Sequence, residues 1–384
     1  MSPVEPNRCL CEPFHVLARL AFPGLMIASL IVACLAGCKK EPATPVPASQ
    51  PTRIITIGYC APEMFGGQIA IMNGLSHHAH AKGWKVLIAN ANDDATTQQE
   101  QIRHFISKHV DAIVAVPIDS RGIKTAIEQA DQAGIPFYTI DRAALDCPVR
   151  MTVLSDNFGA GVRVATYVVE ALRKSRGEAR GSVIELAGDV RQNVAQLRKE
   201  GFHSVIDGYP GISVQTFETQ WVAAKHAEII ESVLIKSVPD VIFMHSDGAG
   251  ISSILPVLRR AGHLHKAGAA GHIALVGIDG SPGMLQAIRT GYADQSASQP
   301  FPDFGIIVNW IDMDLRHQAY KATTINQPGA PWSPATLSHG PEGWRLLLST
   351  TIVTSENVDN KALWGNHDMA ADTASTMPQA PVFP

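Results

Sequence analysis

The feature that most constrains the fold of this chain is a regular alternation of short apolar runs with longer amphipathic segments. In the first part of the chain the short runs are residues 53–59, 84–90, 112–116 and 137–141. Segments with helical periodicity lie between them, at residues 67–82, about 97–108 and 120–133. Strands that alternate with helices of this length favour right-handed crossovers and a parallel sheet. Continuously apolar strands are typical of a sheet that helices cover on both faces.

The same alternation starts again after residue 157. Its predicted strands are residues 182–187, 212–219, 241–244, 274–278 and 293–297. Its predicted helices are residues 158–174, 193–207, 221–236, 248–261 and 282–290. A segment at residues 302–320 completes the lobes, and residues 321–384 are proline-rich and irregular. Because more than about 250–300 residues exceed one ordinary core, two such runs predict an α/β protein with two doubly wound parallel-sheet lobes.

The N-terminal segment resembles the leader of a bacterial lipoprotein. An apolar stretch at residues 22–38 ends in Leu35-Ala36-Gly37-Cys38, and Arg8 and Arg19 supply a positive region before it. The stretch is short for a membrane-spanning helix. We therefore expect a lipoprotein signal peptide that is cut before Cys38, with the lipid attached to that thiol. An ordinary signal peptide or a short anchor helix is the alternative.

The residues after the predicted cleavage point favour the same interpretation. The stretch from Lys39 to Pro51 is rich in proline and polar residues and has no periodicity, which is typical of an extended tether. The sequence thus predicts an exported, periplasmic lipoprotein of the cell envelope, anchored to a membrane at Cys38. Two cysteines, Cys60 and Cys147, remain in the folded part. They either pair in an oxidising compartment or, as we favour, stay as buried free thiols.

The net charge and the absence of known motifs exclude several classes of function. The net charge of −4 gives no basic excess for nucleic acid or for an anionic membrane face. There is no G-x-S-x-G, no P-loop and no dinucleotide fingerprint after a strand. His77 and His80 lie three residues apart on a predicted helix, but no further ligand type completes a metal set nearby. We therefore expect no metal, no cofactor and no enzymatic activity.

Polar side chains follow several predicted strands at the point where each strand ends. Asp141-Arg142, Asp279, Ser246 and Gln299 have such positions, and Trp221 opens a helix directly after a strand. Ligands of open α/β sheets bind outside the carboxyl ends of the strands. Carboxylates accept hydroxyl hydrogen bonds, arginine donates several in one plane, and an aromatic ring covers the apolar face of a sugar. The pattern predicts a polyol site; the alternative is that Asp141 and Asp279 cap turns and Trp221 is core.

An ordered set of motifs between residues 54 and 320 resembles one known family. The motifs are residues 111–119 (DAIVAVPID), 133–142 (AGIPFYTIDR), 155–157 (SDN), 197–202 (LRKEGF) and 276–282 (VGIDGSP), with 352–359 (IVTSENVD) beyond them. They are similar to the ribose-binding-protein-like, type I periplasmic substrate-binding proteins of ABC importers. The resemblance implies the type I fold, in which a multi-strand hinge joins the two lobes.

The resemblance also assigns roles to residues. It implies that Asp141 and Arg142 bind sugar hydroxyls, that Trp221 stacks on the sugar, and that Asp279 accepts a key hydroxyl. Gln299 matches a polar contact beside the hinge, and Ser155, with Asp156, matches the point where the chain crosses between lobes. The other expected ligand residues stand where the sequence departs from the family: Phe65, Gln68, Gln196 and Ser246.

These departures bear on the ligand. Phe65 is a single aromatic residue where the family has a pair, and Ser246 replaces a common asparagine. Gln196 stands where the family often has an arginine, and Arg198 matches a second arginine that is not a ligand. We therefore expect a sugar other than ribose, or a non-sugar molecule with fewer hydroxyls.

The sequence as a whole predicts a monomeric, lipid-anchored binding component of an ABC importer that delivers a sugar or polyol to a permease. A periplasmic ligand sensor that signals to a kinase or chemoreceptor is the alternative. The predicted organisation is: signal peptide 1–37; lipidated cysteine and tether 38–51; first lobe 52–155 plus about 300–330; second lobe 156–299 plus about 331–365; C-terminal tail 366–384.

Overall fold

The computed structural model describes residues 53–367. The predicted signal peptide, the lipid site at Cys38, the tether and all but the first residues of the predicted C-terminal tail lie outside the described residues. Among the described residues no helix is long and apolar enough to cross a membrane. Cys60 and Cys147 are both free and buried, as favoured from the sequence, and burial raises the pKa of the Cys60 thiol to about 12.

The first sheet has eight strands in the order β11-β12-β13-β5-β4-β3-β1-β2. Its strands are β1 (Thr56–Ala61), β2 (Lys85–Asn90), β3 (Ala112–Ala115), β4 (Phe137–Ile140), β5 (Val149–Ser155), β11 (Thr323–Ile325), β12 (Ala335–Gly340) and β13 (Gly343–Leu348). The pairs β11–β12 and β12–β13 are antiparallel, and all other neighbours are parallel. In the central register Tyr59 lies beside Ile88 and Val114.

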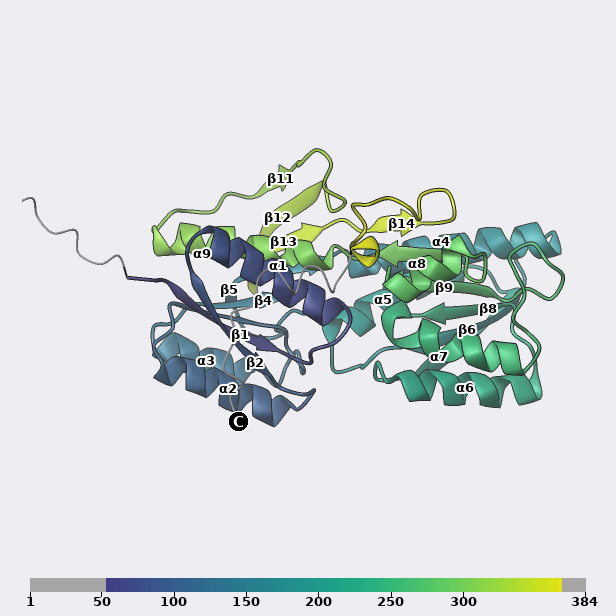
Figure 1. The fold of residues 1–384 in the computed structure, drawn as a ribbon, viewed down its shortest axis with the longest axis horizontal. Coiled ribbons are helices and arrows are strands. Elements are labelled where there is room, and N and C mark those ends of the chain that lie inside the picture. The colour runs from purple at the N-terminus through teal and green to yellow at the C-terminus, as the bar shows by residue number, and fades with distance from the viewer. Residues whose placement is uncertain (1–52, 368–384) are drawn as a thin grey trace, which may run out of the picture. The chain divides into compact units, whose positions relative to one another are not determined.

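Helices cover both faces of this sheet (Figure 1). They are α1 (Gly67–Ala81), α2 (Ala95–Ser107), α3 (Lys124–Gln132), η1 (Phe301–Ile306) and α9 (Ile307–Leu315). On β1, Ile57 and Tyr59 belong to the core with α1, η1 and α9, whereas Cys60 belongs to the core with α2 and α3. Successive side chains of a strand point to opposite faces. A strand covered on both faces must therefore be apolar throughout, as this one is.

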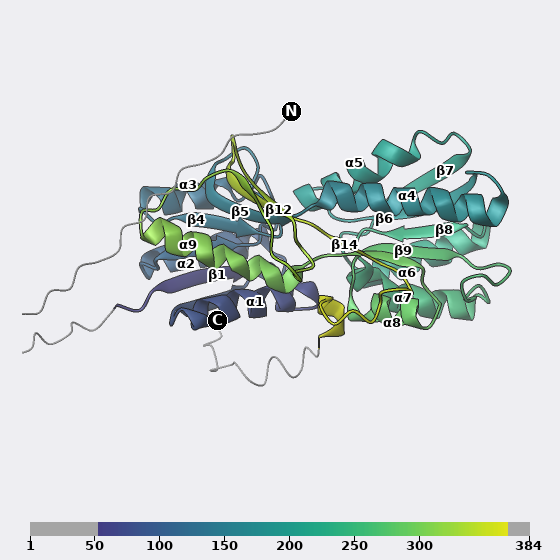
Figure 2. The ribbon, with the colours of Figure 1, turned by 90° about the horizontal axis from the view of Figure 1, so that it is seen from above.

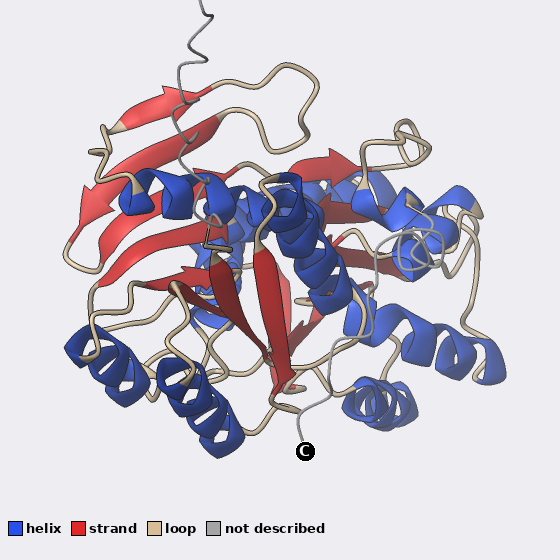
Figure 3. Ribbon diagram, turned by 60° about the vertical axis from the view of Figure 1, so that its left-hand side comes forward, coloured by secondary structure: helices blue, strands red, loops and turns tan. Residues whose placement is uncertain are grey.

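The second sheet has six strands in the order β14-β10-β9-β8-β6-β7. Its strands are β6 (Gly181–Ala187), β7 (Ile212–Glu218), β8 (Val241–Met244), β9 (Ala274–Asp279), β10 (Gln295–Ser298) and β14 (Thr351–Val353). Its helices are α4 (Asn157–Arg176), α5 (Asn193–Ile206), α6 (Ala223–Lys236), α7 (Asp247–Arg260) and α8 (Pro282–Arg289). Helices α4 and α5 pack on one face and α6, α7 and α8 on the other, as Figure 3 also shows.

The five central strands of both sheets follow one topology. They read β2-β1-β3-β4-β5 in the first sheet and β7-β6-β8-β9-β10 in the second. The prediction of two doubly wound parallel-sheet lobes is therefore confirmed. In such a sheet the strand order reverses next to the first strand, and ligands bind in the crevice at the carboxyl ends of the strands at that point.

The chain passes between the lobes at three places (Figure 2). These are the connections from β5 to α4, from β10 to η1, and from β13 to β14. Ser155 ends β5, and the carboxylate of Asp156 caps α4 by accepting a hydrogen bond from the Gly159 amide at 2.9 Å. The Asp156 amide donates to the carbonyl of Leu348 at 2.8 Å, which ties two of the crossings together. Ser155 and Asp156 thus lie in a crossing segment, where the sequence predicted a hinge.

The structure corrects the prediction for the segment after residue 300. Residues 302–320, for which no element type was predicted, contain most of a short 3-10 turn, η1, followed by α9, which ends at Leu315. Residues predicted to be irregular form β11, β12, β13 and β14. In the hairpin β12–β13, Leu337 pairs with Leu346 and both side chains are buried in the first core. The hairpin belongs to the first sheet, whereas the predicted lobe boundary placed residues from about 331 in the second lobe.

Candidate ligand-binding cleft

A cleft of about 940 Å³, open to solvent, lies between the carboxyl ends of the two sheets. The first lobe contributes the loop after β1, the loop after β4, and η1. The second lobe contributes α5 and the loops after β7, β8 and β9, and a short 3-10 turn, η2 (Trp364–Asn366), closes one side. The charged and aromatic residues that line it are Glu63, Phe65, Asp141, Arg142, Arg198, Trp221, Asp279, Phe301 and Trp364.

Asp141 organises the first-lobe side of the cleft. It directly follows β4 in a left-handed conformation (φ 63°), and the residue is 6% exposed. Gln68, in the first turn of α1, donates to its carboxylate at 2.9 Å. The Arg142 guanidinium lies 3.7 Å from the same carboxylate oxygen and also donates to the carbonyl of Pro117 at 3.3 Å. These contacts fix an acceptor and a donor side by side at the end of β4.

Arg198 and Asp279 organise the second-lobe side. Their charged groups lie 3.1 Å apart, and both side chains are buried. Arg198 is held by two further bonds, from Nε to the Asn157 side chain at 2.8 Å and from Nη1 to the carbonyl of His245. Ser246 caps α7 and donates its hydroxyl to Asp279 at 2.5 Å. The guanidinium is thus held rigidly between a carboxylate and two neutral acceptors.

The indole of Trp221 lies against this arginine. The Arg198 guanidinium carbon is 5.7 Å from the ring centroid, and the Trp221 Nε1 donates to Gln192 at 2.7 Å. The ring packs on Gly188, where an added Cβ would stand 1.9 Å from the indole. A glycine at residue 188 therefore lets the outer edge of the indole approach the backbone closely, in a position where Trp221 lines the cleft.

A second buried carboxylate stands behind Asp279. Asp247, in the first turn of α7, accepts hydrogen bonds from the amides of Gly280 and Ser281 at 3.1 and 2.9 Å. Burial raises the pKa of Asp247. Burial also raises the pKa of Asp279 to about 7; Arg198 opposes this rise, and the charge of Asp247 adds to it. Like charges in one dry site cannot both ionise freely.

This carboxylate pair predicts a pH-dependent stability. An unfolded aspartate titrates near its ordinary pKa of 3.8, and folded Asp279 titrates near 7. Between these values the unfolded chain has lost a proton that the folded protein keeps, so folded stability should fall as pH rises from about 4 to about 7. Urea unfolding of the wild type and of Asp279→Asn across this range measures the effect. In Asp279→Asn the free energy of unfolding should fall less between about pH 4 and about pH 7 than in the wild type. Identical pH profiles would contradict the raised pKa of Asp279.

The aromatic wall of the cleft joins both lobes. Trp364 packs on Phe301 with ring centroids 5.1 Å apart, and its Nε1 donates to the backbone carbonyl of Asp279 at 2.7 Å. Both rings are buried. Neither residue was predicted from the sequence, because Phe301 directly follows Gln299-Pro300 and Trp364 lies in a segment predicted to be irregular.

Seven of the predicted site residues line the cleft: Phe65, Gln68, Asp141, Arg142, Trp221, Ser246 and Asp279. Gln196 does not. Its side chain donates to the carbonyl of Val190 at 2.7 Å, and Val194 and Arg198 face the cleft in its place. Residues four apart share one face of a helix, and a residue midway between them points away. The placement of Gln196 is therefore corrected, and Arg198 is the cleft arginine of α5.

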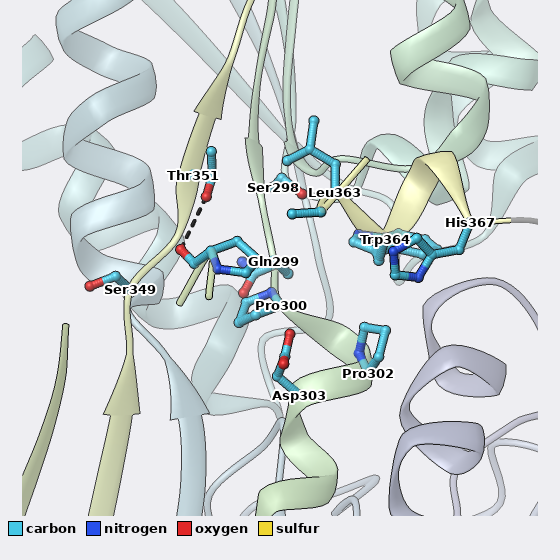
Figure 4. Close-up of a pocket in the computed structure, with 12 residues that line it drawn as sticks. Ser298, Gln299, Pro300, Pro302, Asp303, Ser349, Thr351, Leu363, Trp364 and His367 are labelled. Atoms are coloured by element: carbon cyan, nitrogen blue, oxygen red, sulfur yellow. Dashed lines mark hydrogen bonds between the residues drawn. The ribbon is translucent and has the colours of Figure 1, made fainter. Parts of the chain in front are cut away.

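Gln299 also lies outside the cleft. It is buried next to the crossing from β10 to η1, where its amide donates to Asn157 at 3.3 Å. It lines a smaller neighbouring pocket with Asp303 and Trp364 (Figure 4). Gln299 and Arg198 both donate to the side-chain oxygen of Asn157. Gln299 is therefore linked to the cleft residue Arg198 by hydrogen bonds, but its own side chain does not face the cleft.

Two doubly wound lobes with a polar, aromatic-walled cleft at their strand ends define a protein that binds a small ligand between its lobes. Residues 67–316 match the sequence model of the periplasmic binding protein domain. The chain belongs to this family, and its fold is of type I. It is therefore an exported ligand-binding protein and not an enzyme.

Named relatives agree with this assignment. The ribose import binding protein of Bacillus subtilis is 27% identical over 263 residues, which cover 68% of this chain and 81% of the relative. The galactofuranose-binding protein of Escherichia coli is 28% identical over 60% of this chain and 72% of its own. A solved binding protein of the arabinose ABC transporter from Shewanella sp. ANA-3 has the same fold, with a TM-score of 0.69 at 21% identity; the match covers 84% of this chain and 99% of that structure.

Proposed function

We propose that the protein is the lipid-anchored binding component of an ABC importer, and that it binds a sugar or related polyol in the cleft. One observation carries the ligand class. Two buried polar atoms of cleft residues, Gln68 Oε1 and Arg142 Nε, make no hydrogen bond within residues 53–367, and Asp279 Oδ1 has only the ion pair with Arg198. Buried polar groups without partners are costly. The hydroxyls of a polyol both donate and accept hydrogen bonds. Such a ligand can therefore donate to the free oxygen atoms and accept from the free guanidinium N–H.

The names of the sequence relatives support the same class. They include import binding proteins for ribose and apiose and binding proteins for galactofuranose and xylitol. The fold is also found in the fructose-binding periplasmic domain of a hybrid two-component system, so fold alone does not favour import over sensing. The preference for import rests on the relatives named for import and on the predicted lipid site at Cys38.

Closure about the crossing segments supplies the mechanism. A ligand that touches Asp141 and Arg142 on one lobe and Asp279 and Trp221 on the other gains its full set of contacts only when the lobes approach. Such a ligand shifts the population to the closed state by its differential affinity for that state. The closed protein then presents the paired lobe surfaces to a permease.

A thermal-shift panel tests the ligand class. Purified protein is screened against pentoses, hexoses, linear polyols, inositols and nucleosides. A ligand at about 100 times its dissociation constant adds roughly 2.7 kcal/mol to the stability of the folded state. A shift of several degrees with one sugar or polyol class is the expected result, and a panel without any shift would overturn the proposal.

Truncation of Trp221 tests the site. We expect Trp221→Ala to weaken sugar binding by about 1–3 kcal/mol, because the apolar face of the ligand loses its stacking surface. Trp221→Phe keeps a ring but loses the bond to Gln192, and should cost less. Titration calorimetry with the best ligand of the panel measures both variants. An unchanged dissociation constant in Trp221→Ala would show that the indole does not contact the ligand.

A further inference from the structure

Carboxyl groups outnumber guanidiniums in the cleft. Three carboxylates line it, those of Glu63, Asp141 and Asp279, against the two guanidiniums of Arg142 and Arg198. Arg198 is paired with Asp279 at 3.1 Å and Arg142 with Asp141 at 3.7 Å. Glu63 is therefore the cleft carboxylate without a counter-charge of its own.

Glu63 is placed to meet a ligand. It lies two residues after β1, in the loop that carries Phe65 and Gln68 into the cleft. Its half-buried side chain makes no hydrogen bond and no ion pair with another residue of the described chain. Burial raises the pKa of Glu63 to about 7; Arg142 opposes this rise, and the carboxylates of Asp93 and Asp141 add to it.

The surroundings of Glu63 offer no spare cation. Asp93, also partly exposed, faces the same arginine, and burial raises its pKa too. The nearby Asp189 is already bound by Arg191 through several hydrogen bonds. Closure of the cleft would bury Glu63 further, and an ionised carboxylate that is buried without a partner is strongly disfavoured.

We propose that the ligand of this cleft is a cationic polyol, an amino sugar or an aminated cyclitol, whose ammonium group pairs with Glu63. The inference rests on the proposed polyol function and adds the charge of the ligand to it. The hydroxyls of the ligand would bind Asp141, Arg142 and Asp279, and its amine would lie on the Glu63 side. A hydroxyl can also bond to a carboxylate, but it leaves the negative charge uncompensated, whereas an ammonium group both donates a hydrogen bond and neutralises that charge.

Matched ligand pairs test the inference. Calorimetric titrations at neutral pH compare galactose with galactosamine, glucose with glucosamine, and myo-inositol with an aminodeoxyinositol. We expect one amine to bind about tenfold or more tighter than its neutral partner, as charge-assisted bonds allow. Binding of the amine should also release up to about half a proton near pH 7, because pairing ionises Glu63. Titrations in buffers of different ionisation enthalpy measure that release.

Two variants separate the outcomes. Glu63→Gln keeps the shape of the side chain and should abolish both the amine preference and the proton release. Glu100→Gln removes a charge from an exposed side chain of α2 outside the cleft and should change neither. Neutral sugars that bind as tightly as their amines, or a preference that survives in Glu63→Gln, would overturn the inference and leave sugar binding intact. If neither these compounds nor any member of the thermal-shift panel binds, the proposed polyol function fails with it. A ligand found only among the neutral sugars of the panel would overturn the inference alone.

Discussion

Replacing Asp279 by alanine is expected to abolish detectable ligand binding. The carboxylate is the acceptor at the end of β9, it holds Arg198 at 3.1 Å, and it receives the Ser246 hydroxyl. Its removal leaves a buried guanidinium and a ligand hydroxyl without their acceptor. A hydrogen bond to a charged group contributes about 1.5–3 kcal/mol, and an unpaired buried charge adds to the loss. Calorimetry with the best ligand of the panel should show a dissociation constant raised at least 100-fold, about 2.7 kcal/mol.

Asp279→Asn separates this effect from misfolding. The raised pKa of Asp279 means that the folded protein disfavours its charge, so the neutral amide should leave the free energy of unfolding unchanged or increase it above pH 7. The same variant should still bind poorly. Asp141→Ala, on the opposite lobe, should also abolish binding. Unchanged affinity in both alanine variants would contradict the cleft assignment.

Replacing Arg198 by methionine is expected to cost both binding and stability. The guanidinium carries the ion pair to Asp279, the bonds to Asn157 and His245, and the contact with Trp221. Without it Asp279 and Asp247 share one dry site with no cation, and breaking a buried pair in this way costs about 3 kcal/mol or more. Urea unfolding measures the stability, and calorimetry measures the binding.

Gln196→Ala is the matched control on the same helix. Its side chain bonds to the carbonyl of Val190 and faces away from the cleft, so affinity should stay within about twofold of the wild type. If Gln196→Ala lost ligand binding while Arg198→Met kept it, Gln196 and not Arg198 would be the ligand residue of α5.

The fold and much of the cleft could be predicted because local patterns determine them. The apolar runs that become β4 and β9 are bounded by turn residues, and their carboxyl ends place Asp141 and Asp279 without any knowledge of packing. Loops that follow the strands of a parallel sheet all reach the same edge. This rule also brought Trp221 and Ser246 to the site.

The remaining positions depend on features that a linear reading does not contain. Helix α5 begins at Asn193 as predicted, but its start does not show which face meets the cleft. Matching the family's arginine two residues too early exchanged Arg198 for Gln196. The hairpin β12–β13 has its own signal in Gly340 and Gly343, the two residues that pair at its turn. Trp364 reaches the cleft only because the chain returns to the first lobe and crosses back again through β14.

The three crossings have a consequence for how such a protein can change its ligand. The first sheet takes strands from Thr56–Ser155 and again from Thr323–Leu348, and the second takes the strands between these stretches and then Thr351–Val353. No single cut in the chain separates the two lobes, so a lobe cannot be exchanged with that of a homologue by one recombination event. New specificity has to arise by point substitution in the loops at the strand ends, on a scaffold inherited whole.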